Sequence, residues 1–366
     1  MGRVNHYGIV LAAGEGKRLE PLVRQLRGDS LPKQYVTFIG RRSMLEHTFA
    51  RAEKLIPRER IFTVIAEHHV DFLSVRRQIA VRAPNTVIAQ PENKETAAGI
   101  LLPLMHVYKK DPEALIAVFP SDHFIFEEDR FMSHVAVALQ AVERNPSLFV
   151  LIGVEPTEAQ AEYGYIIPHG VDSERYPSTL RRVRHFIEKP DAATASDLIG
   201  AGALWNTMVM VFKAKNLLDI IAGLNPELSG AFQEVLAAIG EPDEASRIRE
   251  IYRRVKPENF SKGIVEQLPA RHPACLSVLS MGGVLWSDWG LPRSIEWVLR
   301  KIDERESADV LGVAEGRLWK AFSDRLQIGS QRLAQTAELA EAPKRTARRQ
   351  DYKRYAGRPT ATPSTR

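Results

Sequence analysis

The chain has 366 residues, of which 44% are hydrophobic, so it is long and apolar enough for one large or two modest domains. Its single cysteine, Cys275, excludes a disulfide framework and is typical of a reducing compartment. The N-terminus lacks a secretory signal, and no apolar stretch approaches the ~20 residues of a membrane span. We therefore expect a soluble, cytoplasmic protein with no membrane contact.

The formal net charge of +5 is concentrated at the C-terminus. Residues 341–366 carry eight Lys or Arg against two acids, a net +6, which leaves the rest of the chain at −1. The same segment is rich in Pro, Thr and Ala and has no apolar periodicity, so we expect a basic, disordered tail. A near-neutral body argues against nucleic acid as a partner. We interpret the tail as a solvated extension, and a weak contact between the tail and an anionic partner is the alternative.

In the first half of the chain, short apolar runs alternate with helical patterns. Strands are expected at residues 7–11, 60–66, 86–89, 115–119 and 148–154. Helices are expected at residues 43–55, 71–80, 96–109 and 129–144. This alternation predicts an α/β, Rossmann-like mixed sheet that is mainly parallel, with helices on both faces.

The second half of the chain has a more mixed pattern. Strands are expected at residues 163–168, 180–187, 206–212, 274–279 and 283–286. Helices are expected at residues 214–222, 227–239, 244–254 and 292–302. We predict one α/β domain over residues 1–305 with parts 1–155 and 156–305, then a helical extension over 306–340 and the tail 341–366.

Residues 7–35 combine a buried strand, a loop of small residues and several cations. Small residues let a ligand approach the backbone closely, and successive free N–H groups bind anions. The loop resembles neither a dinucleotide fingerprint nor a P-loop, since it lacks a third glycine and a Gly-Lys-Ser/Thr sequence. Arginine can grip phosphate oxygens through two bonds, and lysine acts as a point charge. The candidate triphosphate-binding residues are Leu11, Ala12, Ala13, Gly14, Gly16, Lys17, Arg18 and Lys33; a glycine turn with ordinary surface cations is the alternative.

Within this segment Pro21 interrupts the helical pattern, and residues 24–30 are polar and typical of a loop. We expect residues 24–31 to form a mobile flap over the triphosphate.

Two aspartates follow expected strands: Asp122 in Phe-Pro-Ser-Asp-His and Asp288 in Trp-Ser-Asp-Trp-Gly. Ligands of open α/β sheets lie beyond the carboxyl ends of the strands. Because Mg²⁺ needs few protein carboxylates when phosphate oxygens and water complete its shell, Asp122 and Asp288 are candidate ligands. Each is also a plausible turn or cap residue.

Two further polar segments end strands or open helices. Glu188 and Lys189 could bind the hydroxyls and phosphate of a sugar phosphate, or form an ordinary exposed ion pair. Gln90 and Thr96, at the opening of a helix, could bind a base edge or simply form a polar loop and cap.

Taken in order, these segments resemble the sugar-1-phosphate nucleotidyltransferases, and within them most closely the mannose-1-phosphate guanylyltransferases. The resemblance covers about residues 7–300. It rests on Leu11–Leu19 with Pro21, Pro32–Gln34, Gln90–Pro91 with Thr96–Ala97, Phe119–His123, Tyr163–Ile166, Phe186–Pro190, Trp205–Thr207 and Trp286–Gly290. Each segment alone is a weak signal, whereas the ordered set is specific.

The resemblance implies that a sugar 1-phosphate, with mannose 1-phosphate favoured, attacks the α-phosphorus of an NTP, with GTP favoured, and releases pyrophosphate. It implies that Arg18, Lys33 and Asp122 are catalytic, and that Asp122 and Asp288 hold Mg²⁺. Residues 1–155 would then bind the nucleotide and 156–305 the sugar. The implied nucleotide-binding set adds Gln90, Thr96 and Ala97; the implied sugar-phosphate set is Gly164, Glu188, Lys189 and Asn206.

The sequence departs from the family pattern at several points. Met208 stands where the family usually has glycine, Glu20 replaces a common Trp, residues 28–30 are inserted, and the segment 259–266 is altered. These departures keep two alternatives open: a non-catalytic, nucleotide-binding regulatory homologue, and an enzyme for another sugar phosphate or base. The sequence is compatible with a homodimer and does not fix the oligomeric state.

Overall fold

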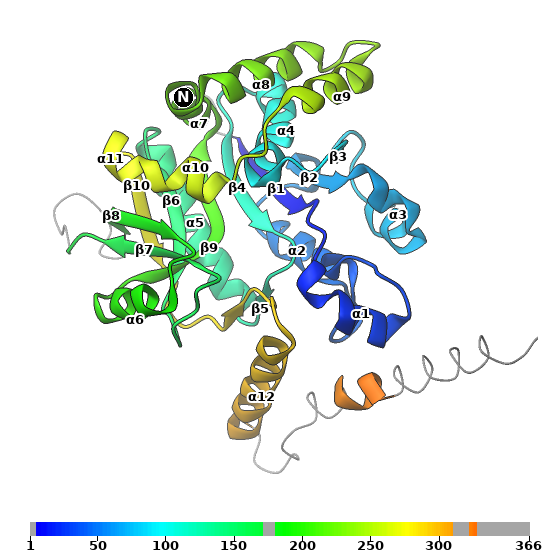
Figure 1. Cartoon of the computed structure of the whole chain (residues 1–366), viewed down its shortest axis with the longest axis vertical. Helices are drawn as coiled ribbons and strands as arrows, with labels where there is room; N and C mark the ends of the chain where they lie inside the picture. The colour runs from blue at the N-terminus through cyan, green and yellow to red at the C-terminus, as the bar shows by residue number, and fades with distance from the viewer. Residues whose placement is uncertain (1–4, 171–179, 310–321, 328–366) are drawn as a thin grey trace, which may run out of the picture.

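The computed structural model describes residues 5–170, 180–309 and 322–327, and its centre is a nine-stranded mixed sheet (Figure 1). The strand order is β3-β2-β1-β4-β9-β6-β10-β8-β7. The strands are β1 (His6–Ala12), β2 (Ile61–Ala66), β3 (Val87–Gln90), β4 (Leu115–Pro120), β5 (Phe124–Ile125), β6 (Phe149–Val154), β7 (Gly164–Pro168), β8 (Leu180–Glu188), β9 (Leu204–Lys213), β10 (Leu276–Ser280) and β11 (Trp286–Ser287). Short β5 and β11 form a separate antiparallel pair.

Helices connect and cover the strands (Figure 1). The α-helices are α1 (Glu20–Arg27), α2 (Met44–Ala52), α3 (Leu73–Ala80), α4 (Glu95–Lys110), α5 (Glu128–Arg144), α6 (Ala192–Gly200), α7 (Ala214–Leu224), α8 (Pro226–Ala238), α9 (Glu244–Arg254), α10 (Phe260–Gly263), α11 (Leu268–Arg271) and α12 (Pro292–Asp309). Short 3₁₀ helices are η1 (Lys17–Leu19), η2 (Lys33–Tyr35), η3 (Arg58–Arg60), η4 (Glu67–Asp71) and η5 (Val265–Gln267).

The first four strands of the sheet are parallel. β1 lies between β2 and β4, with Gly8 paired to Ile61 and to Ala117. β3 continues the parallel order beyond β2. Because parallel strands point the same way, the loops after β1, β2, β3 and β4 all emerge at one edge of the sheet. The glycine loop, Gln90 and Asp122 follow β1, β3 and β4 and so lie at this edge.

The expectation of a mainly parallel sheet is wrong for the second half of the chain. β9 runs antiparallel to both β4 and β6, and β7 and β8 form an antiparallel pair. Beyond β9 only β6 and β10 are parallel neighbours. An apolar run predicts a buried strand but contains no information on the direction of that strand, since strand direction depends on partners far along the chain.

Two apolar layers cover the two faces of the sheet, as predicted. On one face α2 and α5 pack with buried side chains such as Phe131 and Val135. On the other face α4 packs through Ile100 and Leu104, and α7, α8 and α9 extend this layer. Burial on both faces explains why the central strands are apolar at consecutive positions instead of alternating with polar residues.

The loop expected at residues 24–30 is mostly helical. Pro21 lies in the first turn of α1, where a missing N–H costs no helical hydrogen bond. The side chains of Leu22 and Val23, on the inner face of this helix, are buried. Gly28 ends it in the left-handed conformation, with its N–H donating to the carbonyl of Arg24 at 2.7 Å. Leu31 is also buried, whereas residues 24–30 are exposed or half-buried, and the expected flap stays a prediction.

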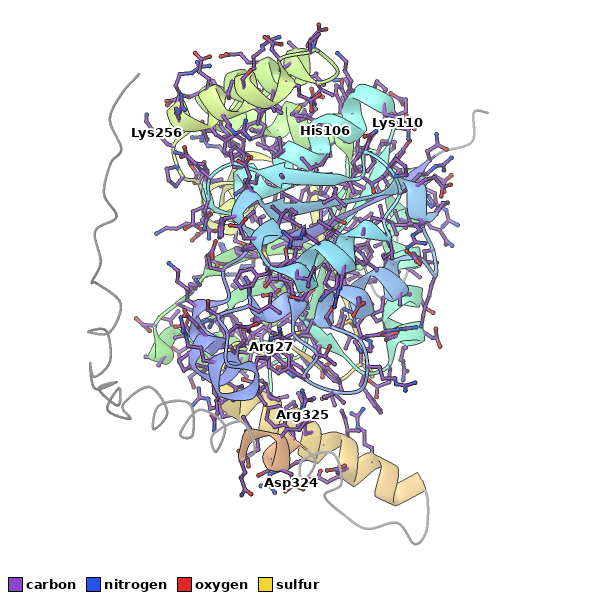
Figure 2. All side chains as sticks on the ribbon, turned by 90° about the vertical axis from the view of Figure 1, so that its right-hand side faces the viewer. Arg27, His106, Lys110, Lys256, Asp324 and Arg325 are labelled. Atoms are coloured by element: carbon purple, nitrogen blue, oxygen red, sulfur yellow. The ribbon has the colours of Figure 1, made fainter. Side chains whose placement is uncertain are left out.

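The C-terminal region is described only in part. α12 extends beyond the expected end at residue 302, and residues 322–327 are helical. Arg325, labelled in Figure 2, donates to the carbonyls of Phe38 at 2.7 Å and Thr37 at 3.1 Å. The remainder of the expected helical extension 306–340 and the whole tail 341–366 lie outside the described residues. None of the helices within the described ranges combines the length and apolarity needed to cross a bilayer.

Candidate active site

The loop after β1 is held by side chains from η2. Gln34 donates its amide hydrogens to the carbonyls of Ala12 at 2.9 Å and Gly14 at 2.7 Å. Gly16 has a φ of 63°, and a Cβ there would lie 3.0 Å from the backbone nitrogen of Lys33. By contrast, a Cβ at Gly14 would meet nothing within 4 Å. The hydrogen bonds from Gln34 thus hold the loop on one side. The space beside Gly14 stays free on the other side, so an anion can reach the backbone N–H groups.

Lys33 is the cation that joins the two predicted acidic segments. Its side chain is only 7% exposed, and its ammonium lies 3.0 Å from a carboxylate oxygen of Asp122. It also donates to the backbone carbonyl of Asp288 at 2.8 Å and lies 3.4 Å from that of Trp289. A buried ammonium with these partners brings the ends of β4 and β11 together behind the glycine loop.

Asp122 is ionised in this arrangement. Burial alone would raise the pKa of its carboxyl, but the ammonium of Lys33, followed by the neighbouring His123, lowers the pKa below its ordinary value of 3.8. The side chain remains about one-third exposed, at 35%, so the carboxylate can still reach a ligand. Burial lowers the pKa of His123, whose imidazole is therefore neutral near pH 7.

Asp288 is oriented by three donors. One carboxylate oxygen accepts from the hydroxyl of Tyr163 at 2.6 Å and from the N–H of Gly290 at 3.0 Å. The other oxygen lies 3.4 Å from the guanidinium of Arg18, which is half exposed and also contacts Glu162 at 3.3 Å. The long contact with Arg18 leaves that oxygen and the cation available to a phosphate or a metal ion.

These carboxylates fit the ligand preference of Mg²⁺. Asp122 and the backbone of Asp288 both contact the one ammonium of Lys33, so the two acidic segments are adjacent. One carboxylate oxygen of Asp122 lies 3.8 Å from the ring of His123, and one of Asp288 lies 3.4 Å from the guanidinium of Arg18, so each makes a long contact with its neighbouring cation or ring. Two such oxygens, completed by phosphate and water, suit a small hard cation.

Gln90 and the start of α4 lie two strands from β1. Gln90 is 3% exposed, and its amide oxygen is buried without a hydrogen-bond partner among the described residues. The hydroxyl of Thr96 accepts from the N–H of Phe260 at 2.8 Å, and the N–H of Ala97 donates to the carbonyl of Glu258 at 3.0 Å. A buried acceptor without a donor needs an explanation, and a bound ligand with an N–H group would supply one.

The predicted sugar-phosphate residues meet where β7, β8 and β9 adjoin. Gly164 is paired with Glu188 across the β7–β8 ladder, and a Cβ at Gly164 would lie 2.6 Å from the Glu188 carboxylate and 3.4 Å from Asn206. Burial raises the pKa of Glu188, with Lys189 opposing the change. The structure therefore brings Gly164, Glu188 and Asn206 into contact, with Lys189 next along the chain.

Left-handed backbone is concentrated in these same segments. Among the described residues, five non-glycine residues have positive φ, and four of them are Glu95 (63°), Lys189 (50°), Met208 (56°) and Trp289 (44°). Each directly follows, or lies within two residues of, a predicted site residue. Such conformations cost about 1–3 kcal/mol each and persist where surrounding structure holds them, which is frequent at functional sites. The left-handed φ of Met208 also explains why glycine suits this position.

Two residues that contribute to the site were not among the predicted site residues. Tyr163 orients Asp288, and Gln34 shapes the glycine loop. Both belong to segments on which the resemblance rests, so the sequence did contain a signal. Their partners, 125 and 20 residues away, could not be identified from it.

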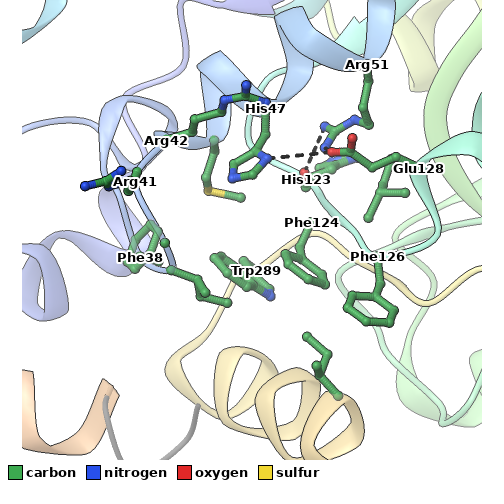
Figure 3. A pocket seen from close by; sticks show the side chains of 15 residues that line it. Phe38, Arg41, Arg42, His47, Arg51, His123, Phe124, Phe126, Glu128 and Trp289 are labelled. Carbon is green, nitrogen blue, oxygen red and sulfur yellow. Dashed lines mark hydrogen bonds and ion pairs between the residues drawn. The ribbon is translucent and has the colours of Figure 1, made fainter. Parts of the chain in front are cut away.

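A separate cavity of about 480 Å³ lies on the other side of His123 and Trp289. Figure 3 shows its aromatic side chains, with Glu128 joined to Arg51 at 3.3 Å and to His47 at 3.7 Å. None of the predicted site residues lines it, but His123 and Trp289, which do, directly follow Asp122 and Asp288 in the chain.

A model of the nucleotidyl transferase family matches residues 7–305, the stretch that contains all of this geometry. The chain belongs to the nucleotidyl transferase family. The resemblance seen in the sequence is thereby confirmed at the level of the family. The match also covers all predicted site residues, from Leu11 to Asp288.

Relatives of this nucleotidyl transferase include proteins that act on mannose 1-phosphate by name. It is 28% identical to a mannose-1-phosphate guanylyltransferase of Klebsiella pneumoniae over 88% of this chain and 64% of that protein. It is 31% identical to the xanthan biosynthesis protein XanB of Xanthomonas campestris over 62% of this chain and 46% of that protein. The chain thus spans about half to two-thirds of the length of these curated relatives.

Solved structures share the fold. A Thermus thermophilus structure described as a mannose-1-phosphate geranyltransferase superposes with a TM-score of 0.68 and 27% identity, covering 81% of this chain and 79% of that one. A Helicobacter pylori structure described as a mannose-6-phosphate isomerase has a TM-score of 0.60 at 20% identity, covering 78% of this chain and 100% of that one. The second likeness concerns the fold alone.

Proposed function

We propose that this nucleotidyl transferase makes a nucleotide sugar from GTP and mannose 1-phosphate, releasing pyrophosphate. The observation that carries the proposal is the contact of Lys33 with Asp122 at 3.0 Å, beside the open glycine loop. The names of relatives at about 28% identity over most of the chain support mannose 1-phosphate and guanine as the substrate and the base.

In the proposed reaction, a phosphate oxygen of the sugar 1-phosphate attacks the α-phosphorus of the NTP. The new P–O bond forms as the bond between the α-phosphorus and the bridging oxygen breaks, and pyrophosphate leaves with that electron pair. Such transfers depend on positioning and charge stabilisation rather than on a covalent enzyme intermediate. No side chain needs to become covalently linked to the substrate.

Different residues of the site have different proposed roles in this reaction. Gly14, Gly16 and Lys17 would hold the triphosphate, and Gln90 with Thr96 and Ala97 would face the base. Arg18 and Lys33 would stabilise charge that develops on the α-phosphate. Asp122 and Asp288 would hold Mg²⁺, which neutralises phosphate oxygens when bound. Gly164, Glu188 and Asn206 would contact the sugar, and Lys189 its phosphate.

Pyrophosphate release tests this proposal directly. Purified protein is incubated with Mg²⁺ and each pairing of four NTPs with a set of sugar 1-phosphates. We expect the fastest release with GTP and mannose 1-phosphate. Faster release with another pair would reassign the substrates, and no release with any pair from folded protein would exclude the enzymatic reaction.

A non-catalytic, nucleotide-binding homologue is the second candidate. Met208 favours it, because a bulky residue holds a left-handed φ of 56° beside Asn206. Its thioether accepts from the hydroxyl of Ser261 at 3.1 Å. This candidate predicts GTP binding in a calorimeter together with zero pyrophosphate release.

Replacing Gly164 by alanine should impair the sugar side selectively. The new methyl group would meet Glu188 at 2.6 Å and the ring of Phe186 at 2.9 Å, so the Glu188 carboxylate must move. We expect KM for the sugar 1-phosphate to rise by about 10-fold or more while KM for the NTP changes little. Gly230→Ala, on an exposed part of α8 with nothing within 4 Å, is the matched control. Equal rises in both KM values would contradict the assignment.

Replacing Met208 by glycine should relax sugar selectivity. Glycine adopts φ 56° without strain, and loss of the thioether removes the partner of the Ser261 hydroxyl and opens space beside Asn206. We expect discrimination against bulkier, N-acetylated sugar 1-phosphates to fall by about 10-fold, measured as the ratio of kcat/KM values. An unchanged ratio would show that Met208 does not limit the size of the sugar.

A further inference from the structure

Three potential metal ligands converge beside the glycine loop. Glu15 lies between Gly14 and Gly16, whereas His68 and His69 lie in η4 directly after β2. Since β1 and β2 are parallel neighbours, their following loops meet at the same edge of the sheet. One ligand atom from each of the three residues lies within 4.8 Å of the others, a grouping found within the described ranges.

The orientation of His69 leaves its Nε2 directed at this point. Its Nδ1 lies 3.1 Å from the hydroxyl of Tyr35, and that hydroxyl donates to the carbonyl of Ala12 at 3.0 Å. The Tyr35 hydroxyl therefore holds the ring at Nδ1 and leaves Nε2 as the nitrogen available to a metal ion. Metal-binding histidines are commonly oriented in this way, by a hydrogen bond from the nitrogen that does not bind the metal.

Nε2 of His69 is buried and has no hydrogen-bond partner among the described residues. It faces the Glu15 carboxylate, with 3.7 Å between Nε2 and the nearer oxygen. A cation between Nε2 and the carboxylate would give the buried nitrogen the partner that it lacks. An ordinary ion pair of Glu15 with His68, 3.1 Å apart, would explain His68 but not His69.

Two of the three separations are close to those of a tetrahedral zinc site. Bonds of about 2.0–2.1 Å place two ligand atoms of a tetrahedron about 3.3–3.4 Å apart. The two separations from the Glu15 oxygen, 3.1 Å to His68 and 3.7 Å to His69, bracket this value. Two imidazoles and one carboxylate form a donor set that zinc accepts, with a fourth position for water.

We propose that Glu15, His68 and His69 bind a transition-metal dication of the zinc class, at a site separate from Asp122 and Asp288. The bound ion would tie the glycine loop to η4 and hold the N–H groups of Gly14 and Gly16 in place. The site stands independently of the proposed sugar-nucleotide reaction, because it requires neither turnover nor a nucleotide.

Cobalt titration of the tag-free full chain, without nucleotide, tests the proposal. We expect one Co²⁺ per chain with the intense visible absorption of tetrahedral coordination, displaced by Zn²⁺. Zn²⁺ should also raise the unfolding temperature, since it binds only the folded site. Absence of both effects at millimolar metal would overturn the proposal.

The Co²⁺ affinities of single-residue variants test whether the ion binds at these three residues. His68 is 58% exposed, so His68→Ala should fold normally and lose at least about 10-fold in Co²⁺ affinity; Glu15→Gln should do the same. His134→Ala, on α5 with its ring 3.4 Å from the carbonyl of Gly282, is the histidine control and should bind as the wild type does. Asp122→Asn should also retain the cobalt spectrum. Wild-type affinity in His68→Ala, or loss in Asp122→Asn alone, would place the metal elsewhere and refute the assignment.

Discussion

Asp122→Asn is expected to lower kcat by at least about 10²–10³-fold while leaving the fold intact. Asparagine keeps the size of the side chain but removes the negative charge that would hold Mg²⁺. The carboxylate of the wild type is ionised at pH 7, because the ammonium of Lys33 opposes the effect of burial and the pKa of Asp122 lies below 3.8. The measurement is pyrophosphate release at saturating substrates, together with a Mg²⁺ titration in which the variant needs higher concentrations.

Asp219→Asn is the matched control. Asp219 also pairs with a lysine, Lys215 at 2.7 Å, but its side chain is 63% exposed on α7. An exposed pair of this kind contributes ~1 kcal/mol or less to stability, and the control should keep full activity. If Asp122→Asn is folded by circular dichroism and turns over at the rate of the control, Asp122 has no role in metal binding or catalysis.

Lys33→Met is expected to impair both stability and catalysis. Methionine has a similar length, so the change removes the ammonium and little volume. The carboxylate of Asp122 and the carbonyls of Asp288 and Trp289 would lose their shared donor. Breaking a fully buried pair costs about 3–5 kcal/mol. Because Asp122 is about one-third exposed, we expect a smaller loss of about 1–3 kcal/mol, measured by urea unfolding at pH 7.

The pH dependence of this loss has a definite sign. In the wild type the pKa of Asp122 lies below 3.8, so its ion pair contributes stability above that pH and loses it as the pH falls through the lowered pKa. In Lys33→Met burial acts without the opposing ammonium, so the pKa rises and the carboxyl protonates at higher pH. The difference in unfolding free energy between the two proteins should therefore shrink as the pH falls from 7 towards 3.

A double-mutant cycle with Asp122→Asn separates pairing from the other contacts of Lys33. If the pair dominates, Lys33→Met should cost less in the Asp122→Asn background than in the wild type. Equal costs in both backgrounds would show that Lys33 acts through the backbone carbonyls of Asp288 and Trp289. Catalysis should fall in either case if Lys33 stabilises the α-phosphate as proposed.

Local sequence patterns were sufficient to predict most strands, the polar loops of the candidate site and the family. Apolar runs such as residues 115–119 gave strands near their expected places, because side-chain periodicity is set by backbone geometry. The small residues around Gly14 and the acids after β4 and near β11 marked the correct edge of the sheet. Order along the chain sufficed to recognise the family, which the match over residues 7–305 confirms.

Only the tertiary structure decided which of these residues meet. Lys33 contacts the Asp288 carbonyl across 255 positions of sequence, and Tyr163 reaches the Asp288 carboxylate across 125. Three further features also lacked a signal in the sequence: the antiparallel direction of β9, the burial of one face of α1, and the approach of Glu15 to His69. Each depends on packing between distant segments. A single sequence contains no local signal for such partners, because periodicity specifies which face a residue occupies and not what lies opposite it.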